Sequence, residues 1–465
     1  MKLNRRDFLR LSATVATGAV LASCQPAAPA PAVEEKPAAK VEEVKKEEKP
    51  AEKIKLRYMD WGGERYPKSW QEVGPQFLED HPEIEISYEP RPDLWREVIT
   101  AEYVAGTGPD LFGHCCDHAK VFWEAGQIKD IKPYVDRDIS AEELKDFFES
   151  QLTFWTDKGT GALMAWPKYQ GNLCIIYNEE MVKEAGVTVP EKWTDAWGPE
   201  EYREFLQKLT VGEYGSPDRV FGGGRSVWSD RNTPCFNSNG AHFVNPEDDT
   251  DCWLGKPEAM EVQEFWRVLR MDDHTMPMPA DMAGEKSMRN LFPIRRLASE
   301  EEGVWAFNDT MDRSEFKWNI CPLWSFKVDW PMTLSTTDGW SMWSGTKHPD
   351  AVWELIKFLA SPTFEASIAK TTFLQPARKS MVPKWIEILR EADERFNDIN
   401  LEVILESAEG GYGVPMELYY SQSLGEEIMK PVYEQVFELG TAGVDAIAKA
   451  CDELTEKLRA EKAKA

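Results

Sequence analysis

The stretch Ala165-Trp166-Pro167-Lys168-Tyr169-Gln170-Gly171-Asn172-Leu173-Cys174-Ile175-Ile176-Tyr177-Asn178 decides the fold. It opens with an aromatic–proline step, loosens at Gln170-Gly171, and continues as an apolar run, Leu173 to Tyr177, that is typical of a buried strand. A helix is expected directly afterwards, over Glu179 to Ala185. Polar and aromatic groups followed by an apolar strand indicate that the chain passes here from one lobe to another, beside a ligand cleft.

Residues before this stretch alternate between strand and helix patterns. Strands are predicted from Ile54 to Tyr58, from Ile84 to Tyr88 and from Asp110 to Phe112, and helices from Trp70 to Asp80 and from Leu94 to Ala105. Such alternation is typical of an α/β lobe with a largely parallel sheet. Ligands bind at the carboxyl ends of parallel strands. Those ends are Asp60-Trp61, His114 to His118, and Trp166 to Gln170.

The chain beyond Gly171 is expected to form a second lobe of similar construction. Strands are predicted at Val304 to Phe307 and at Trp318 to Cys321, and Thr336 to Trp343 resembles a return crossing. The C-terminal region is predicted to be helical, with an interruption at Met429 and Pro431. About 400 residues follow Ile54, too many for one core. The predicted lobes are residues 54–168 plus 338–375, and residues 169–337 plus 376–465.

The N-terminus has the pattern of an export signal. Arg5-Arg6 precedes a short apolar segment, Leu11 to Ala22, which is about half the ~20 residues that a membrane-spanning helix needs. Small residues before Cys24 suit cleavage and lipid attachment there, so residues 1–24 resemble a twin-arginine lipoprotein signal peptide. Residues 25–53 hold only Gln, Pro, Ala, Val, Glu and Lys, and are predicted to be a disordered tether. The expected location is the outer face of the cell membrane, or the periplasm.

Charge limits the class of partner. The formal net charge is −27 for the whole chain, which argues against nucleic acid and anionic lipid. It is compatible with a neutral or cationic ligand, and also with simple solubility outside the cell.

The cysteines and histidines do not form a recognisable metal-binding motif. Cys235 and Cys252 flank a polar loop, and the sequence leaves open whether they form a disulfide; Cys174 and Cys321 are expected to be buried thiols. The cluster from His114 to His118 does not have the spacing of a zinc site, and no metal or cofactor is predicted.

Short motifs along the mature chain occur in the order found in one protein family. They are Gly106 to Phe112, Trp166-Pro167, Ile176 to Met181, Glu184 to Val187, Pro190 with Trp193, Asn237 to Gly240, Asp338 to Trp340, Ala351 to Ser361, and Leu374 to Arg378. This order resembles the extracellular solute-binding proteins of ABC importers, of the sugar-binding type, the group that includes maltose-binding protein. The resemblance implies a two-lobed, periplasmic-binding-protein-like α/β fold. Each lobe would be a mainly parallel sheet flanked by helices, with hinge crossings between the lobes.

The resemblance also implies a set of ligand-binding positions. They are Asp60, Trp61, His114, Asp117, His118, Tyr169, Gln170, Trp228 and Trp340. The sequence departs from the maltose binder after the strand expected at Val304 to Phe307, because Asn308 to Met311 has no aromatic residue. A maltodextrin ligand is therefore not implied.

Aromatic rings bury the C–H faces of sugars, and polar side chains pair with their hydroxyls. We therefore predict a monomeric binding protein that captures a sugar or oligosaccharide and presents it to the transmembrane subunits of an ABC permease. The alternatives are a binding protein for a peptide or polyamine, and a secreted carbohydrate-active enzyme. No nucleophile elbow, zinc-protease or phosphate-loop motif is present in the sequence, which favours a protein that is not an enzyme.

Overall fold

The structure is a computed structural model. It describes residues 53–464 except 63–64, 92–94, 116–117, 227–229, 283–286, 328, 330 and 336–337. The predicted signal peptide with Cys24, the tether up to residue 52, and the candidate ligand residues Asp117 and Trp228 lie outside the described residues.

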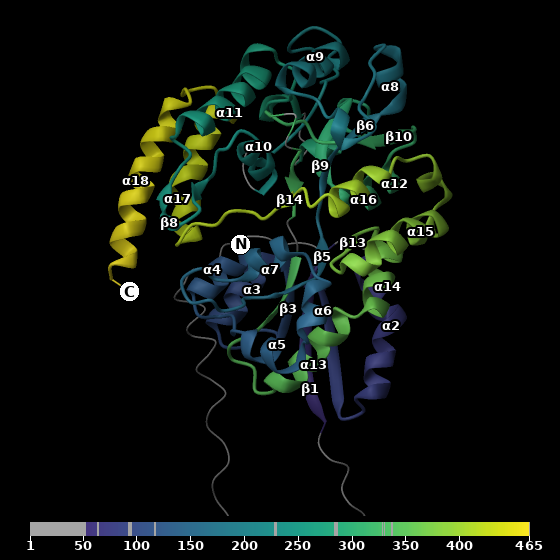
Figure 1. Ribbon diagram of the computed structural model, residues 1–465, viewed down its shortest axis with the longest axis vertical. Coiled ribbons are helices and arrows are strands. Elements are labelled where there is room, and N and C mark those ends of the chain that lie inside the picture. The colour runs from purple at the N-terminus through teal and green to yellow at the C-terminus, as the bar shows by residue number, and fades with distance from the viewer. Residues whose placement is uncertain are drawn as a thin grey trace, which may run out of the picture. The chain divides into compact units, whose positions relative to one another are not determined.

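A five-stranded sheet forms the first half of the fold, in the order β2-β1-β3-β12-β4 (Figure 1). β1 pairs in parallel with β2 and β3, whereas β12 pairs antiparallel with β3 and β4. The carboxyl ends of β1 and β3 therefore meet the start of β12 at one edge. The strands are β1 (Ile54–Trp61), β2 (Ile84–Arg91), β3 (Leu111–Cys115), β4 (Trp166–Pro167) and β12 (Asp338–Met342).

Helices flank this sheet. The first of them, α2, begins at Tyr66, earlier than the predicted start at Trp70, because Pro67 occupies its first turn, where a missing N–H costs nothing. α2 packs against α14 beside the sheet (Figure 1). The flanking helices are α2 (Tyr66–Asp80), α3 (Trp95–Val104), α4 (His118–Glu124), α5 (Lys132–Asp138), α6 (Ala141–Lys145), α7 (Glu149–Trp155), α13 (Pro349–Leu359) and α14 (Pro362–Thr372).

The second sheet is built around β6 (Leu173–Asn178), the strand predicted from the opening stretch. All six of its residues are buried. β6 lies between β10 (Trp318–Cys321) and β9 (Ser299–Gly303) and pairs antiparallel with both. The expectation of a mainly parallel second sheet is thus wrong for these strands. A long helical segment separates β6 from β9, and strand–helix alternation does not fix the direction in which the chain returns.

The strand predicted at Val304 to Phe307 is wrong for those residues, because the strand lies just before them in the sequence. It is β9, with the sequence Ser-Glu-Glu-Glu-Gly. The residues after it form a 3-10 turn (Val304–Ala306) and α12 (Phe307–Arg313). Three successive glutamates conceal a buried strand from any hydrophobicity pattern. Arginines neutralise two of them: Arg225 lies 3.2 Å from Glu301, with both side chains fully buried, and Arg231 lies 3.1 Å from Glu302.

Further helices surround the second sheet. The predicted interruption at Pro431 is wrong, because α17 continues through it and ends two residues later, followed by a π-type turn (Glu434–Glu438). These helices are α8 (Glu179–Glu184), α9 (Pro199–Leu209), α10 (Thr233–Ser238), α11 (Pro257–Arg267), α15 (Val382–Ala392), α16 (Glu402–Glu409), α17 (Gln422–Tyr433) and α18 (Asp445–Lys462).

Two short ladders connect the sheets (Figure 1). β5 (Tyr169–Gln170) pairs antiparallel with β13 (Gln375–Pro376), and β11 (Thr333–Leu334) pairs in parallel with β14 (Gly413–Val414). The Thr333 hydroxyl exchanges hydrogen bonds of 2.8 Å with the backbone of Leu173. Backbone and side-chain hydrogen bonds therefore tie the segments that run between the two sheets to one another.

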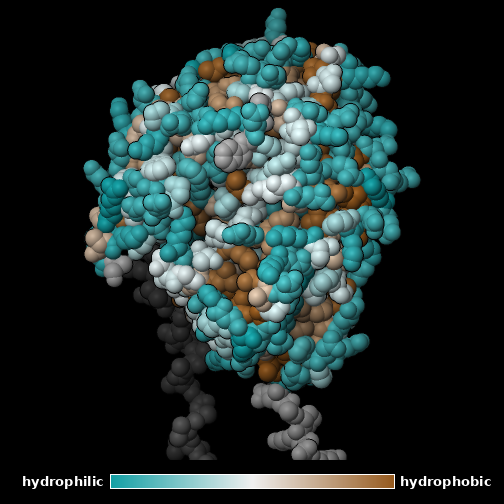
Figure 2. All heavy atoms as spheres, in the orientation of Figure 1, coloured by the Kyte–Doolittle hydropathy of each residue, from teal (hydrophilic) through white to brown (hydrophobic). Residues whose placement is uncertain are grey.

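The visible face of the molecule carries mostly hydrophilic residues (Figure 2), as the net charge of −27 suggests. Among the described residues, no helix is both long enough and apolar enough to cross a bilayer.

A disulfide joins Cys252, at the end of β8 (Asp248–Cys252), to Cys451 on α18, with the Cα atoms 5.4 Å apart. The pairing of Cys235 with Cys252, which the sequence left open, is therefore excluded. Cys235 is a buried free thiol beside the Arg225 guanidinium. Cys174 and Cys321 are buried free thiols, as predicted.

Breaking this disulfide is expected to lower stability by about 2–4 kcal/mol, because it closes a loop with a sequence separation of 199 residues. Thermal unfolding should shift to lower temperature in the double variant Cys252→Ser/Cys451→Ser, and in the wild type with reductant. Reductant should leave the melting temperature of the double variant unchanged. A further decrease there would assign the effect to other cysteines.

Candidate functional site

A carboxylate–lysine cluster (Asp60, Lys168 and Asp338) lies where β1 ends, β4 ends and β12 begins. The Lys168 ammonium is 2.7 Å from Asp60 Oδ1, and the three side chains are between 1% and 5% exposed. Asp338 accepts a hydrogen bond of 2.8 Å from Trp61 Nε1 and another from the Tyr169 hydroxyl. Segments far apart in the sequence thus meet at the sheet edge that the strand order predicts.

Aromatic rings enclose the charge of Lys168. Its Nζ atom lies 4.5 Å from the centre of the Trp340 ring and 4.7 Å from that of Tyr66, within cation–π range. The close packing depends on Gly113 in β3, because a Cβ atom at that position would collide with both the Asp60 carboxylate and the Trp340 ring.

The cluster holds two carboxyl groups against one ammonium. Burial raises the pKa of Asp338 to about 7; Lys168 acts against this rise and Asp60 adds to it. Burial also raises the pKa of Asp60, with Lys168 again opposing. Near neutral pH, therefore, Asp338 holds a proton more readily than an exposed aspartate does, while its oxygens accept from the Trp61 indole and the Tyr169 hydroxyl.

This pKa predicts how stability depends on pH. Folding raises the pKa of Asp338 from 3.8 to about 7, so the folded state binds a proton that the unfolded state releases. The contribution of Asp338 to stability therefore falls as pH rises through that window. Melting temperatures should decrease less steeply between pH 4 and pH 7 in Asp338→Asn than in the wild type. Glu79→Gln, on the exposed side of α2, should keep the wild-type slope; equal slopes in all three proteins would contradict the prediction.

Next to the cluster, Trp61, Trp95 and His118 form an aromatic row. The rings of Trp61 and Trp95 are 6.0 Å apart, and that of His118 meets Trp95 edge-on at 5.4 Å. Trp61 is half-buried, so part of its ring remains available.

His114 is placed differently. It is fully buried, and its Nε2 lies 2.7 Å from the Ser341 hydroxyl. Burial lowers the pKa of His114 to about 3, so the ring is neutral. In this structure His114 has no exposed surface with which to touch a ligand.

An opposing wall (Arg231, Arg289, Glu302 and Trp305) is built on β9 of the second sheet and on short turns around it. Glu302 accepts from Trp305 Nε1 at 2.7 Å and from Arg231 at 3.1 Å. Burial and the carboxylates of Asp338 and Asp60 raise the pKa of the Tyr66 hydroxyl, and the Arg289 guanidinium opposes them. Arg289 is therefore the wall residue whose charge acts on Tyr66, beside the cluster.

Two contacts hold these walls together from opposite directions. The Arg65 guanidinium, just before α2, binds Asp312 on α12, with Nε 2.8 Å from Oδ2. Glu124 at the end of α4 accepts a hydrogen bond of 2.8 Å from the backbone N–H of Gln422 at the start of α17. Both contacts join elements that carry the first sheet to elements that carry the second.

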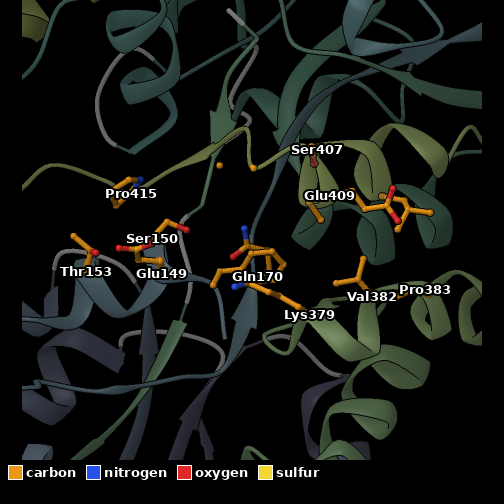
Figure 3. Close-up of a pocket in the computed structure, with 15 residues that line it drawn as sticks. Glu149, Ser150, Thr153, Gln170, Lys379, Val382, Pro383, Ser407, Glu409 and Pro415 are labelled. Carbon is orange, nitrogen blue, oxygen red and sulfur yellow. The ribbon is translucent and has the colours of Figure 1, made fainter. Parts of the chain in front are cut away.

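Gln170 faces away from the cluster. Successive residues of a strand point to opposite faces, so Tyr169 reaches Asp338 while Gln170 lines a rear cavity of about 710 Å³ (Figure 3). Gln170 Nε2 donates to the Ser335 hydroxyl at 2.8 Å, in the crossing segment. The rear cavity is bounded by residues of α7, β5, α15 and α16, and it contains none of the other predicted ligand residues.

The structure thus gathers Asp60, Trp61, Tyr169 and Trp340 at one sheet edge, with His118 nearby. Sequence analysis missed the residues that complete the site, because most look unremarkable in isolation. Lys168 stands inside the opening stretch, where a lysine next to a proline suggests an exposed loop. The missed residues are Tyr66, Lys168, Asp338, Arg231, Arg289, Glu302 and Trp305. No group of metal-binding side chains occurs among the described residues.

A family model described as "Bacterial extracellular solute-binding protein" matches residues 60–366. The chain is 22% identical over 296 residues to the maltotriose-binding protein of Pyrococcus abyssi, a match that covers 63% of this chain and 59% of that protein. The chain therefore matches less than two thirds of this curated relative.

Solved structures extend the comparison. The ABC substrate-binding protein Lmo0181 from Listeria monocytogenes, in complex with cycloalternan, has a TM-score of 0.74 at 18% identity; the match covers 88% of this chain and 99% of that one. The maltose/maltodextrin-binding domain MalE from Bdellovibrio bacteriovorus, bound to maltotriose, has a TM-score of 0.66 at 18% identity, with 87% and 99% covered. These similarities confirm the predicted two-lobed α/β fold.

Proposed function

Because this chain belongs to the family of bacterial extracellular solute-binding proteins, we propose that it captures a saccharide between two lobes and presents it to the permease of an ABC transporter. The proposed lobes are residues 54–168 plus 338–375, and residues 169–337 plus 376–465. One observation carries the proposal: Trp61 donates to Asp338 of the carboxylate–lysine cluster, Trp305 donates to Glu302 of the opposing wall, and the charge of Arg289 in that wall acts on the Tyr66 hydroxyl beside the cluster.

The chemistry of these walls suits a sugar. Trp61 and Trp305 are both half-buried, so each offers ring surface to the C–H face of a pyranose. Asp338, Glu302 and Arg289 supply acceptors and donors for hydroxyl groups. Only when the walls approach can one ligand touch both, so binding would favour the closed arrangement that Arg65 and Asp312 tie together. The related proteins named above bind maltotriose and cycloalternan, which supports an oligosaccharide.

Isothermal calorimetry on the chain without residues 1–24 tests this proposal. Maltotriose, mannotriose and cycloalternan are the first ligands, with a tripeptide and spermidine as the other solute classes. At least one saccharide should bind with a 1:1 stoichiometry and remain chemically unchanged. Binding of only the peptide or the polyamine would overturn the saccharide class, and hydrolysis of a saccharide would identify an enzyme instead.

The family is extracellular, so the protein acts outside the cytoplasm. We propose that residues 1–24 are a twin-arginine lipoprotein signal, that Cys24 carries the lipid, and that residues 25–53 are a tether that lets a monomeric binding body reach the permease. In a bacterial host supplied with labelled palmitate, the wild type should incorporate label and Cys24→Ala should not. Ser23→Ala keeps a small residue before the cysteine and should still be labelled. Label in Cys24→Ala would exclude this lipidation site.

A further inference from the structure

Behind the opposing wall lies a cavity of about 350 Å³ lined by four arginines, which we call the arginine cavity. Its charged lining includes Arg225, Arg231, Arg270 and Arg289. Four converging guanidinium groups are unexpected in a chain with a net charge of −27. The volume is near the lower limit of ligand pockets, about 300–1,000 Å³, and suits a group the size of one sugar ring.

Arg270 is the most deeply buried of these cations without an ion-pair partner. Its side chain is 2% exposed and donates only to two backbone carbonyl groups, those of Phe437 at 3.3 Å and Arg225 at 3.1 Å. Its Nε atom has no hydrogen-bond partner. Among the described residues no carboxylate lies within ion-pairing distance, and burial lowers the pKa of Arg270 to about 10. A buried donor without an acceptor is destabilising, and an incoming anionic oxygen would supply the missing acceptor.

Arg289 is partly exposed, and among the described residues it makes no close ion pair. Within that part of the chain its nearest carboxylate oxygens are Glu302 Oε1 at 3.9 Å and Asp309 Oδ2 at 3.8 Å, beyond hydrogen-bonding distance. The same guanidinium acts on Tyr66 across the gap. Arg289 therefore borders both the arginine cavity and the proposed saccharide site, with its donors available to a ligand.

Some of the acids around the cavity are already committed to arginines. Glu301 pairs with Arg225, and Glu302 pairs with Arg231 at 3.1 Å. Glu300 is 4% exposed, and one of its oxygens has no partner. Burial and neighbouring Glu302 raise the pKa of Glu300 to about 8, which favours the protonated form, and that form can donate a hydrogen bond. Among the described residues, Arg270 and Arg289 are therefore the cavity arginines without a close carboxylate.

We propose that the arginine cavity receives a uronate ring, so that the ligand is an acidic saccharide whose carboxylate is bound by Arg289 and Arg270. The proposal rests on the saccharide-binding function above and narrows its ligand class. Guanidinium–carboxylate hydrogen bonds are about twice as strong as neutral ones and can be bidentate. The negative charge of Glu302 does not repel this group strongly, because Arg231 already pairs with it at 3.1 Å.

The test compares saccharides of equal length that differ in charge. Calorimetry on the chain without residues 1–24 would use trisaccharides of galacturonate, glucuronate and mannuronate, their methyl esters, maltotriose and mannotriose. At least one acidic trisaccharide should bind tenfold or more tightly than its own methyl ester and than both neutral trisaccharides. The ester keeps the shape and removes the charge, so the ratio isolates the carboxylate.

Arg289→Gln should reduce that acid-to-ester ratio to near one while the ester still binds. Arg295→Gln is the matched control, because Arg295 is 45% exposed and pairs with Glu180 at 2.8 Å on the surface; it should keep the wild-type ratio. Neutral saccharides that bind as tightly as every acidic one would overturn the uronate assignment and leave the proposed function intact. No binding by any saccharide would overturn both. An unchanged ratio in Arg289→Gln would remove Arg289 from the site.

Discussion

Replacing Lys168 with methionine is expected to lower the free energy of unfolding by about 3–5 kcal/mol. The substitution keeps the length of the side chain but leaves Asp60 and Asp338 buried without their cation, and breaking a buried ion pair from one side costs about this much. Chemical denaturation at pH 8, where the carboxyl groups are most ionised, should show the full effect. At pH 5 the loss should be smaller, because protonated carboxyl groups do not need the ammonium.

Lys317→Met is the matched control. Lys317 pairs with Asp398 at 2.8 Å, a distance close to that of the Lys168 pair, but both side chains are at least 65% exposed. An exposed pair is screened by water and contributes little to stability, so this variant should unfold close to the wild type. Adding Asp60→Asn to Lys168→Met should recover part of the lost stability. If Lys168→Met and Lys317→Met lower the free energy of unfolding by equal amounts, the buried ion pair of Lys168 does not stabilise the fold more than an exposed one.

Replacing Trp305 with alanine is expected to weaken saccharide binding by about 10- to 30-fold, equivalent to about 1.4–2 kcal/mol, the loss typical of a central aromatic contact. The ring is half-buried, is held by the 2.7 Å hydrogen bond from Nε1 to Glu302, and lies 5.4 Å from the Arg231 guanidinium. Calorimetry with the best saccharide from the screen measures the loss.

Trp253 offers a close match for this comparison. It is also half-buried, donates from Nε1 to Asp251 at 2.8 Å, and has a cation, Lys256, 5.8 Å from its ring. Trp253 lies beside the disulfide rather than on the opposing wall, so Trp253→Ala should retain wild-type affinity. Equal losses in the two variants would indicate a general effect on stability, and no loss in Trp305→Ala would exclude Trp305 from the ligand site.

Local sequence patterns predicted the elements that follow simple periodicity. β6, β10 and α3 lie close to where apolar spacing placed them, because each buries apolar side chains at regular spacing. β9 escaped prediction because its burial depends on arginines that are distant in the sequence. The antiparallel direction of the strands in the second sheet could not be predicted from the sequence either. Strand direction there depends on the path of the long connections between strands rather than on local composition.

The candidate site was predictable in part. Strand ends placed Asp60 and Trp61 at one edge of the first sheet, where the structure has them, since parallel strands bring their carboxyl ends together; their ligand role stays a prediction. The sequence did not show that the side chains of Tyr169 and Gln170 point in opposite directions, because it does not fix which face of the strand each residue occupies. Tyr169 points toward Asp338, and Gln170 lines the rear cavity. Lys168 was overlooked because a buried lysine makes sense only once two carboxylates are known to surround it. Trp305 was overlooked because it falls within the strand predicted from Val304 to Phe307, and a residue of a buried strand is expected to pack in the hydrophobic core.

The cross-link between Cys252 and Cys451 has a consequence for the order of events in biogenesis. Thiols stay reduced in the bacterial cytoplasm, and a twin-arginine route would move the chain only after it has folded. The two sulfur atoms would then be brought together by packing of the last helix before any oxidant is met. The disulfide would form outside the cell, after folding, and would stabilise a structure that is already folded, which fits its position on the final helix. Newly made protein in the cytoplasm should then be folded but still reduced at these two cysteines.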